Sequence, residues 1–146
     1  MIRVFLDANV YFAGIFSRAG ASSLILELAR KKQVAVLASR LVLREADRNL
    51  RRKTDPQTLK AFHLFLKETS VHILRTPPDK VLKKYEPYIH PKDVPILATA
   101  VEAGVDYLVT LDRRHFLTPK ILSHFKEIKI LTSGDFVREW SALKKR

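Results

Sequence analysis

The segment DVPILATAVEAGVDYLVTLD, residues 93–112, carries the clearest structural pattern of the chain. Pro95 stands in the first turn of a helical pattern that stops at Gly104, and this is the usual order of helix start and stop signals. Residues 107–111 then form a short apolar run that predicts a strand ending at Asp112. A helix that leads directly into a buried strand is half of a βαβ unit, so the segment predicts a parallel sheet.

The same alternation of strands and helices continues on both sides of this segment. Apolar runs predict four more strands, at residues 4–6, 34–38, 71–74 and 128–131. Helical patterns occupy residues 22–32, 41–52, 55–66, 77–88 and 133–146. Strands separated by helices favour right-handed crossovers and a mostly parallel sheet with both faces covered. We therefore predict one three-layer α/β/α domain over residues 1–146, with about five strands.

The composition narrows the range of functions. The chain has 27 Lys and Arg against 15 Asp and Glu, a net charge of +12, which attracts polyanions such as nucleic acid or anionic lipid. A well-solvated surface is the simpler interpretation of the same charge. Apolar residues make up 47% of the chain, too many for a disordered basic tail. With only four glycines, neither a GxGxxG nor a GxxxxGK[ST] phosphate loop can be assembled.

The cysteine content and the hydropathy indicate in which cellular compartment the protein is expected. The chain has no cysteine, which excludes disulfide frameworks, cysteine zinc sites and thiol catalysis, and fits a reducing compartment. The apolar run at the amino terminus is too short for a signal peptide, and no stretch approaches the ~20 apolar residues of a membrane span. We expect a cytoplasmic protein that does not contact membrane.

Four acidic residues interrupt apolar structure. Asp7 and Asp112 directly follow predicted strands, Asp93 opens a crossover helix, and Glu45 lies in the opening turns of another. The amino end of a crossover helix lies at the carboxyl edge of the strands, where parallel α/β sheets bind ligands. Each acid alone is explained as a turn residue, a helix cap or a flanking side chain. Together they predict a carboxylate cluster at one edge of the sheet.

Such a cluster needs cations, because neighbouring carboxylates repel and raise one another's pKa. Lys and Arg side chains could supply the positive charge, and so could a metal ion. Oxygen ligands alone favour Mg²⁺ or Mn²⁺ over zinc. The histidines show no close pair with ligand spacing, and we expect them at the surface or in packing, at positions 63, 72, 90, 115 and 124.

These motifs resemble a PIN domain, the nuclease fold of many prokaryotic toxin–antitoxin systems. The resemblance rests on LDAN at residues 6–9, on the segment 39–50 around Glu45, and on residues 93–100 leading into 106–112. It implies the strand order 3-2-1-4-5, which places the ends of the first and fourth strands side by side. It further implies that one or two Mg²⁺ or Mn²⁺ ions are held by a quartet of Asp7, Glu45, Asp93 and Asp112.

The resemblance also implies roles for neighbouring polar and basic residues. Asn9 and Thr110 match polar positions beside the metal, where they would orient its ligands. Excess positive charge would hold the phosphates that flank the cleaved bond. The candidates for this contact are Arg48, Arg51, Arg52 and Lys53 on the Glu45 helix, with Arg113 and Arg114 after Asp112. Solvated helix faces are the alternative interpretation of the first four.

By the same resemblance the chain is expected to be a metal-dependent endoribonuclease of the short VapC-like kind. Such a protein is the toxin of a type II toxin–antitoxin pair, acts as a homodimer and is blocked by a small antitoxin. A housekeeping RNA-processing PIN nuclease and a catalytically inactive RNA- or partner-binding PIN relative are the alternatives.

Two other enzyme classes also place an Asp after the first strand of a parallel sheet. Aspartate-nucleophile phosphatases need a second Asp two residues later, where this chain has Asn9. Phosphorelay receivers need paired acids near the start and a Lys that follows a Thr at a late strand end, and neither is evident. The pattern therefore argues against both classes.

Overall fold

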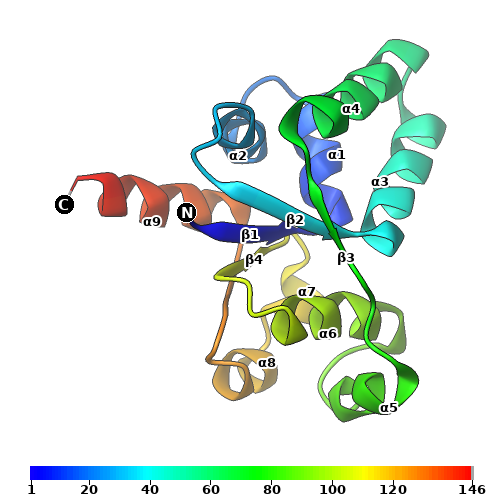
Figure 1. Cartoon of the computed structure of the whole chain (residues 1–146), viewed down its shortest axis with the longest axis vertical. Helices are drawn as coiled ribbons and strands as arrows, with labels where there is room; N and C mark the ends of the chain where they lie inside the picture. The colour runs from blue at the N-terminus through cyan, green and yellow to red at the C-terminus, as the bar shows by residue number, and fades with distance from the viewer. Residues whose placement is uncertain (146) are drawn as a thin grey trace.

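The computed structural model describes residues 1–145, and within them five strands form one parallel sheet (Figure 1). The order in the sheet is β3-β2-β1-β4-β5, which confirms the expected order. All four pairings between neighbouring strands are parallel. In chain order the strands are β1 (Arg3–Leu6), β2 (Ala35–Ser39), β3 (His72–Leu74), β4 (Tyr107–Val109) and β5 (Lys129–Leu131).

Helices cover both faces of this sheet, as the predicted three-layer architecture requires (Figure 1). One face carries α1 (Ala8–Phe16), α2 (Ala21–Arg30), α3 (Arg40–Lys53) and α4 (Pro56–Thr69). The other carries α5 (Asp79–Leu82), α6 (Val94–Glu102), α7 (Arg113–Phe116) and α8 (Pro119–His124), with short 3₁₀ turns η1 (Lys83–Tyr85) and η2 (Pro91–Asp93). The last helix, α9 (Ser133–Lys144), follows β5 and packs against α2.

Three helices were not predicted from the sequence, and each has a physical reason. Residues 8–16 are apolar on nearly every side, so α1 shows little helical periodicity and is buried between the sheet and its neighbours. The helices α7 and α8 are four and six residues long, too short for a periodic pattern.

Some predicted boundaries of helices and strands were wrong. The helix predicted at 77–88 is interrupted, and the strand predicted at 107–111 ends at Val109. The helix predicted to reach residue 146 ends at Lys144, and Arg146 itself lies outside the described residues.

Aromatic packing and one glycine hold α1 in place. The ring of Tyr11 lies edge-on to Phe62 at 5.8 Å and to Phe65 at 6.3 Å, which fixes α4 against α1. On the other side, a Cβ atom at Gly14 would lie 2.6 Å from the Leu26 side chain. The close approach of α1 and α2 therefore needs glycine at this position. These contacts set the direction in which α1 leaves the end of β1.

Across residues 1–145, no single helix is long and apolar enough to cross a membrane. The pair α1 and α2 meets the length and hydropathy criteria only when taken together, with a bend of 93° between the two helices.

Candidate active site

The ends of β1 and β4 create the site at the carboxyl edge of the sheet. Leu6 pairs with Val109 in adjacent parallel strands, so Asp7 and Thr110 follow them side by side. From here the chain crosses to β2 on one side and, after β4, to β5 on the other. This reversal is the switch point at which parallel α/β sheets bind ligands.

The carboxylate of Asp7 is held from several directions. Asp7 caps α1, with Oδ1 accepting a hydrogen bond from the Ala8 amide at 2.8 Å. Its Oδ2 accepts from the Thr110 hydroxyl at 2.7 Å and from Asn9 Nδ2 at 3.3 Å. The whole residue is only 5% exposed. The simpler interpretation of Asp7 as a helix cap is therefore correct, but it accounts for only one of the two oxygens.

Burial raises the pKa of Asp7 to about 6. The hydrogen bonds from Thr110 and Ala8 oppose this rise, whereas the negative charges of Glu45 and Asp93 add to it. Asp7 thus lies within electrostatic range of two other predicted site residues. A carboxylate whose charged form is disfavoured in this way is stabilised by any cation that enters the site.

Asn9 and Thr110 tie the two strand ends together. The Thr110 hydroxyl accepts a hydrogen bond from the Asp112 amide at 3.1 Å, and Asn9 Oδ1 accepts from the Leu111 amide at 3.0 Å. Asn9 Nδ2 also lies 3.4 Å from the Thr110 hydroxyl. Both residues therefore lie beside Asp7, where the sequence places them, and they shape the backbone that leads to Asp112.

Asp93 presents a buried oxygen without a partner. It stands at the start of α6, yet its side chain makes no capping hydrogen bond to that helix. The residue is 4% exposed, and Oδ2 has no hydrogen-bond partner within the described chain. Burial raises the pKa of Asp93, and the charge of Asp112 adds to this effect, while nearby Lys92 and His115 oppose it. Helix capping, the simpler interpretation, does not explain this side chain.

Asp112 and His115 form a close pair. Asp112 caps α7, with Oδ1 accepting from the His115 amide at 3.0 Å. Its Oδ2 lies 2.8 Å from His115 Nδ1. Partial burial acts to raise the pKa of Asp112, but the hydrogen bonds and charge of His115 outweigh it and hold the pKa below its ordinary value.

Asp93, Asp112 and His115 together form a three-residue cluster. One potential ligand atom from each lies within 4.8 Å of the other two. From the sequence His115 is expected at the surface or in packing, and its place in this cluster is not predicted. Its spacing from Asp112 was the available signal, because a capping side chain meets the residue three positions later.

Glu45 approaches the site from α3. The helix begins directly after β2, where the Ser39 hydroxyl accepts from the Val42 amide at 3.3 Å. Glu45 is half-buried beside the buried stripe of Val42 and Ala46, on the flank predicted for it. Its charge raises the pKa of Asp7. Within the described residues, however, neither Glu45 nor Asp7 belongs to the cluster of ligand atoms around Asp93.

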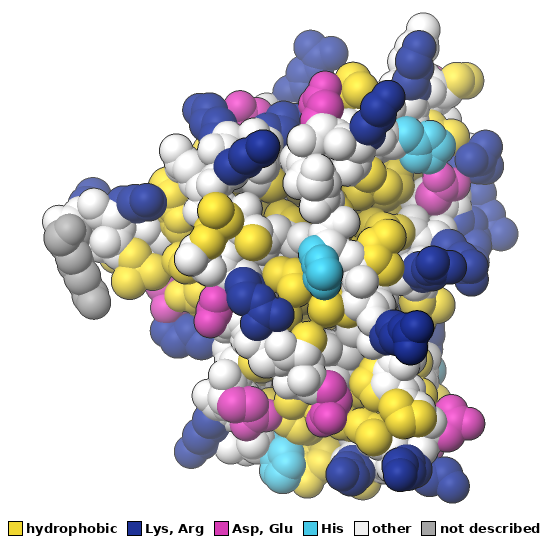
Figure 2. Space-filling view, in the orientation of Figure 1, with side chains coloured by type: hydrophobic (Ala, Val, Ile, Leu, Met, Phe, Trp, Pro, Cys, Tyr) yellow, Lys and Arg dark blue, Asp and Glu magenta, His cyan; other side chains and the backbone are white. Residues whose placement is uncertain are grey.

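The predicted phosphate-binding side chains divide into two groups. Arg48, Arg52, Arg113 and Arg114 are exposed, and none of them takes part in an ion pair within residues 1–145. Arg51 instead pairs with Asp47 at 3.1 Å, and the Lys53 ammonium lies 5.8 Å from the ring of Phe12. A groove of about 470 Å³ between α3 and α4 is lined in part by Arg40, Arg44, Arg48 and Arg51. Figure 2 shows Lys and Arg side chains on much of the visible face, including the region of α3 and α4.

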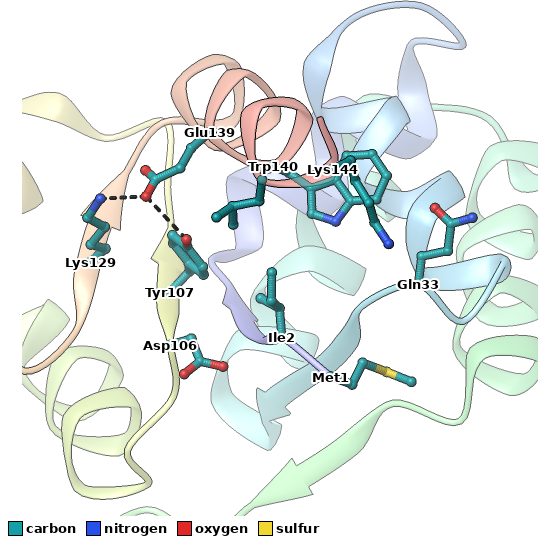
Figure 3. Close-up of a pocket in the computed structure, with 10 residues that line it drawn as sticks. Met1, Ile2, Gln33, Asp106, Tyr107, Lys129, Glu139, Trp140 and Lys144 are labelled. Carbon is teal, nitrogen blue, oxygen red and sulfur yellow. Dashed lines mark hydrogen bonds and ion pairs between the residues drawn. The ribbon is translucent and has the colours of Figure 1, made fainter. Parts of the chain in front are cut away.

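A cavity of about 680 Å³ lies at the opposite edge of the sheet, beside the amino ends of β1, β4 and β5 (Figure 3). There Glu139 accepts a hydrogen bond from the Tyr107 hydroxyl at 3.2 Å and forms an ion pair with Lys129. Its lining contains none of the four predicted acids. The volume of this cavity exceeds that of the α3–α4 groove, but its position separates it from the carboxylate cluster.

Comparisons with known proteins agree with this fold. Solved structures of similar fold include DNA-bound VapBC from Salmonella typhimurium, with 17% identity and a TM-score of 0.65 over 91% of this chain and 99% of that chain. VapBC2 from Rickettsia felis, bound to a promoter DNA fragment, has 17% identity and a TM-score of 0.63, covering 90% and 98%. VapC20 from Mycobacterium tuberculosis, a toxin that cleaves the sarcin–ricin loop, has 16% identity and a TM-score of 0.56, covering 86% and 98%.

The search of curated proteins gave no match. In the comparison with protein families, the family model described as PIN domain matches residues 3–114. This range contains the strands β1 to β4 and all four predicted acids. The chain therefore belongs to the PIN domain family.

Proposed function

We propose that this PIN domain is a divalent-metal-dependent endoribonuclease and the toxin of a toxin–antitoxin pair. The observation that carries the proposal is the buried Oδ2 of Asp93, which has no hydrogen-bond partner within residues 1–145 and lies within electrostatic range of Asp7 and Asp112. Buried polar atoms are nearly always paired, and an unpaired carboxylate oxygen is costly. A cation bound at this edge would remove that cost.

The residues present fit a hard divalent cation. Their donors are mainly carboxylate oxygens, the ligands that Mg²⁺ and Mn²⁺ prefer. In this proposal one or two such ions are held by Asp7, Glu45, Asp93 and Asp112. When bound, a divalent ion neutralises charge that develops on the phosphoryl oxygens and lowers the pKa of an attacking water.

The surrounding residues would hold the ligands and the substrate in position. The hydrogen bonds from Ala8, Asn9 and Thr110 restrict the carboxylate of Asp7, so little ordering remains to be done when substrate binds. Arg113 and Arg114 follow the acidic cluster directly and extend into solvent, where they can attract phosphates on either side of the cleaved bond. Without these two arginine side chains, the acidic edge would repel RNA.

The proposed role as a toxin rests on the structural neighbours. The similar structures from Salmonella typhimurium and Rickettsia felis are VapBC complexes, and VapC20 is described as a toxin that cleaves the sarcin–ricin loop. By analogy we propose an RNA substrate, a small antitoxin that blocks the site, and a homodimeric enzyme. The net charge of +12 supports a polyanionic substrate.

Cleavage assays on matched RNA and DNA oligonucleotides test this proposal. We expect cleavage of RNA alone, dependent on Mg²⁺ or Mn²⁺, and lost in Asp93→Asn and Asp112→Asn while circular dichroism shows a folded protein. Glu27→Gln is the matched control, because Glu27 is a partly exposed acid on α2 that pairs with Arg30. Cleavage that continues in EDTA would refute metal dependence, and equal cleavage of DNA would refute the assignment to RNA.

A further inference from the structure

We infer that His115 is a direct ligand of the divalent metal, so that the site has a mixed nitrogen and oxygen donor set. This inference rests on the proposed metal-dependent function and adds a residue that the acidic quartet does not include. It is carried by three observations, namely the spacing of the donor atoms, the unpartnered oxygen of Asp93, and the backbone hydrogen bond that already caps α7.

The donor atoms are spaced as ligands of one ion. His115 Nδ1 lies 2.8 Å from Asp112 Oδ2 and 4.0 Å from Asp93 Oδ2. In an octahedral site with bonds of about 2.1 Å, neighbouring ligand atoms are about 3.0 Å apart and opposite ones about 4.2 Å. The distances of 2.8 Å and 4.0 Å therefore match a neighbouring and an opposite pair.

The unpartnered oxygen belongs to this same cluster. The Asp93 side chain is only 6% exposed, and its Oδ2 accepts no hydrogen bond within the described chain. His115 Nδ1 is one of the basic atoms near it, but 4.0 Å is too long for a hydrogen bond. A direct pairing of imidazole and carboxylate thus leaves Asp93 unsatisfied. An ion between the two groups satisfies both.

Capping of α7 does not require the imidazole. The backbone amide of His115 already donates to Asp112 Oδ1 at 3.0 Å, which is the capping hydrogen bond. The contact of Nδ1 with Oδ2 is therefore additional to what the start of α7 needs. The nearby His90 provides a contrast, because its Nδ1 accepts a hydrogen bond from the Lys92 amide at 3.1 Å and is not available to a metal through that atom.

A nitrogen donor makes a distinct prediction about metal preference. Mg²⁺ binds oxygen almost exclusively and keeps several waters, whereas imidazole suits transition metals. With His115 as a ligand, the site should bind Mn²⁺ more tightly than Mg²⁺. Removal of the imidazole should weaken Mn²⁺ binding much more than Mg²⁺ binding.

The test is pulsed EPR of Mn²⁺ bound to the full chain labelled with ¹⁵N-histidine, together with Mn²⁺ and Mg²⁺ titrations by calorimetry. We expect hyperfine coupling to a directly bound nitrogen in the wild type and in His90→Ala, and its loss in His115→Ala. The affinity for Mn²⁺ should fall by about tenfold or more in His115→Ala. The His90 ring lies 5.7 Å from that of His115, so His90→Ala is a close control.

His115→Asn separates ligation from positioning. Its side-chain amide can still donate to Asp112, but it is a poor replacement for imidazole as a ligand. Recovery of Mn²⁺ affinity in His115→Asn would overturn the inference and make His115 a positioning residue. Mn²⁺ binding to the wild type without nitrogen coupling would also overturn it, while leaving the proposed function intact. Absence of any Mn²⁺ or Mg²⁺ binding would refute the proposed metal dependence and the inference with it.

Discussion

Replacing Asp7 by Asn should change how the stability of the metal-free protein depends on pH. Burial raises the pKa of Asp7 from 3.8 to about 6. Between these values the folded protein retains a proton that the unfolded chain has released, so the free energy of unfolding falls as pH rises. The stabilising contribution is complete below pH 3.8 and is lost as pH rises through about 6.

The size of the effect follows from the two pKa values. Their difference, about 6 minus 3.8, is about 2.2, and at about 1.4 kcal/mol for each pKa unit it corresponds to about 3 kcal/mol. Asn can still accept from the Ala8 amide, but its own amide would face the donor of Asn9, a cost of about 1 kcal/mol that does not change with pH. The pH-dependent difference between the proteins is therefore separable from this constant cost.

Urea unfolding followed by circular dichroism, in EDTA at pH 3.5, 5 and 7.5, measures the effect. Relative to Asp7→Asn, the wild type should lose about 3 kcal/mol between the lowest and the highest pH. Asp112→Asn is the control, because the pKa of Asp112 is held below its ordinary value of 3.8. The contribution of Asp112 is lost only as pH falls below that value through the folded pKa, so from pH 5 to 7.5 the stability curve of Asp112→Asn should run parallel to that of the wild type. Parallel stability curves for wild type and Asp7→Asn would refute the account of Asp7.

Three further outcomes are expected. Mn²⁺ at a hundredfold excess over its Kd should stabilise the wild type by about 2.7 kcal/mol, and Asp7→Asn much less; equal shifts in Tm would remove Asp7 from the metal site. Replacing Arg113 and Arg114 together by Ala should weaken RNA binding and reduce the slope of log K against log salt by roughly one to two, so an unchanged slope would show that neither contacts phosphate. Gly14→Ala should cost about 1–3 kcal/mol in urea unfolding, because its Cβ would overlap Leu26, and full stability would mean that α1 and α2 can separate freely.

The sheet could be predicted because its strands are short, apolar and bounded by polar residues. Periodicity also placed Glu45 beside the buried stripe of its helix, since Val42, Ala46 and Leu50 recur at helical spacing and are all fully buried. The same reasoning failed for α1, whose residues are apolar on nearly every side, so that no polar face marks it as a helix. Local patterns thus identify an element when its environment differs from one side to the other.

The same distinction between local pattern and long-range packing applies to the residues of the candidate site. That Asp7 and Asp112 follow strands, and that Asp93 begins a helix, could be inferred from neighbouring residues alone, because local pattern sets where an element starts and ends. The pairing of β1 with β4, and the turn of α7 that carries His115 toward Asp93, depend on contacts between residues far apart in the chain. Asp93 Oδ2 is buried with no hydrogen-bond partner within residues 1–145, and burial raises the pKa of Asp7. Sequence pattern therefore singled out the four acids as candidates, whereas packing between distant segments placed His115 beside Asp93 and Asp112 and set the charge environment around them.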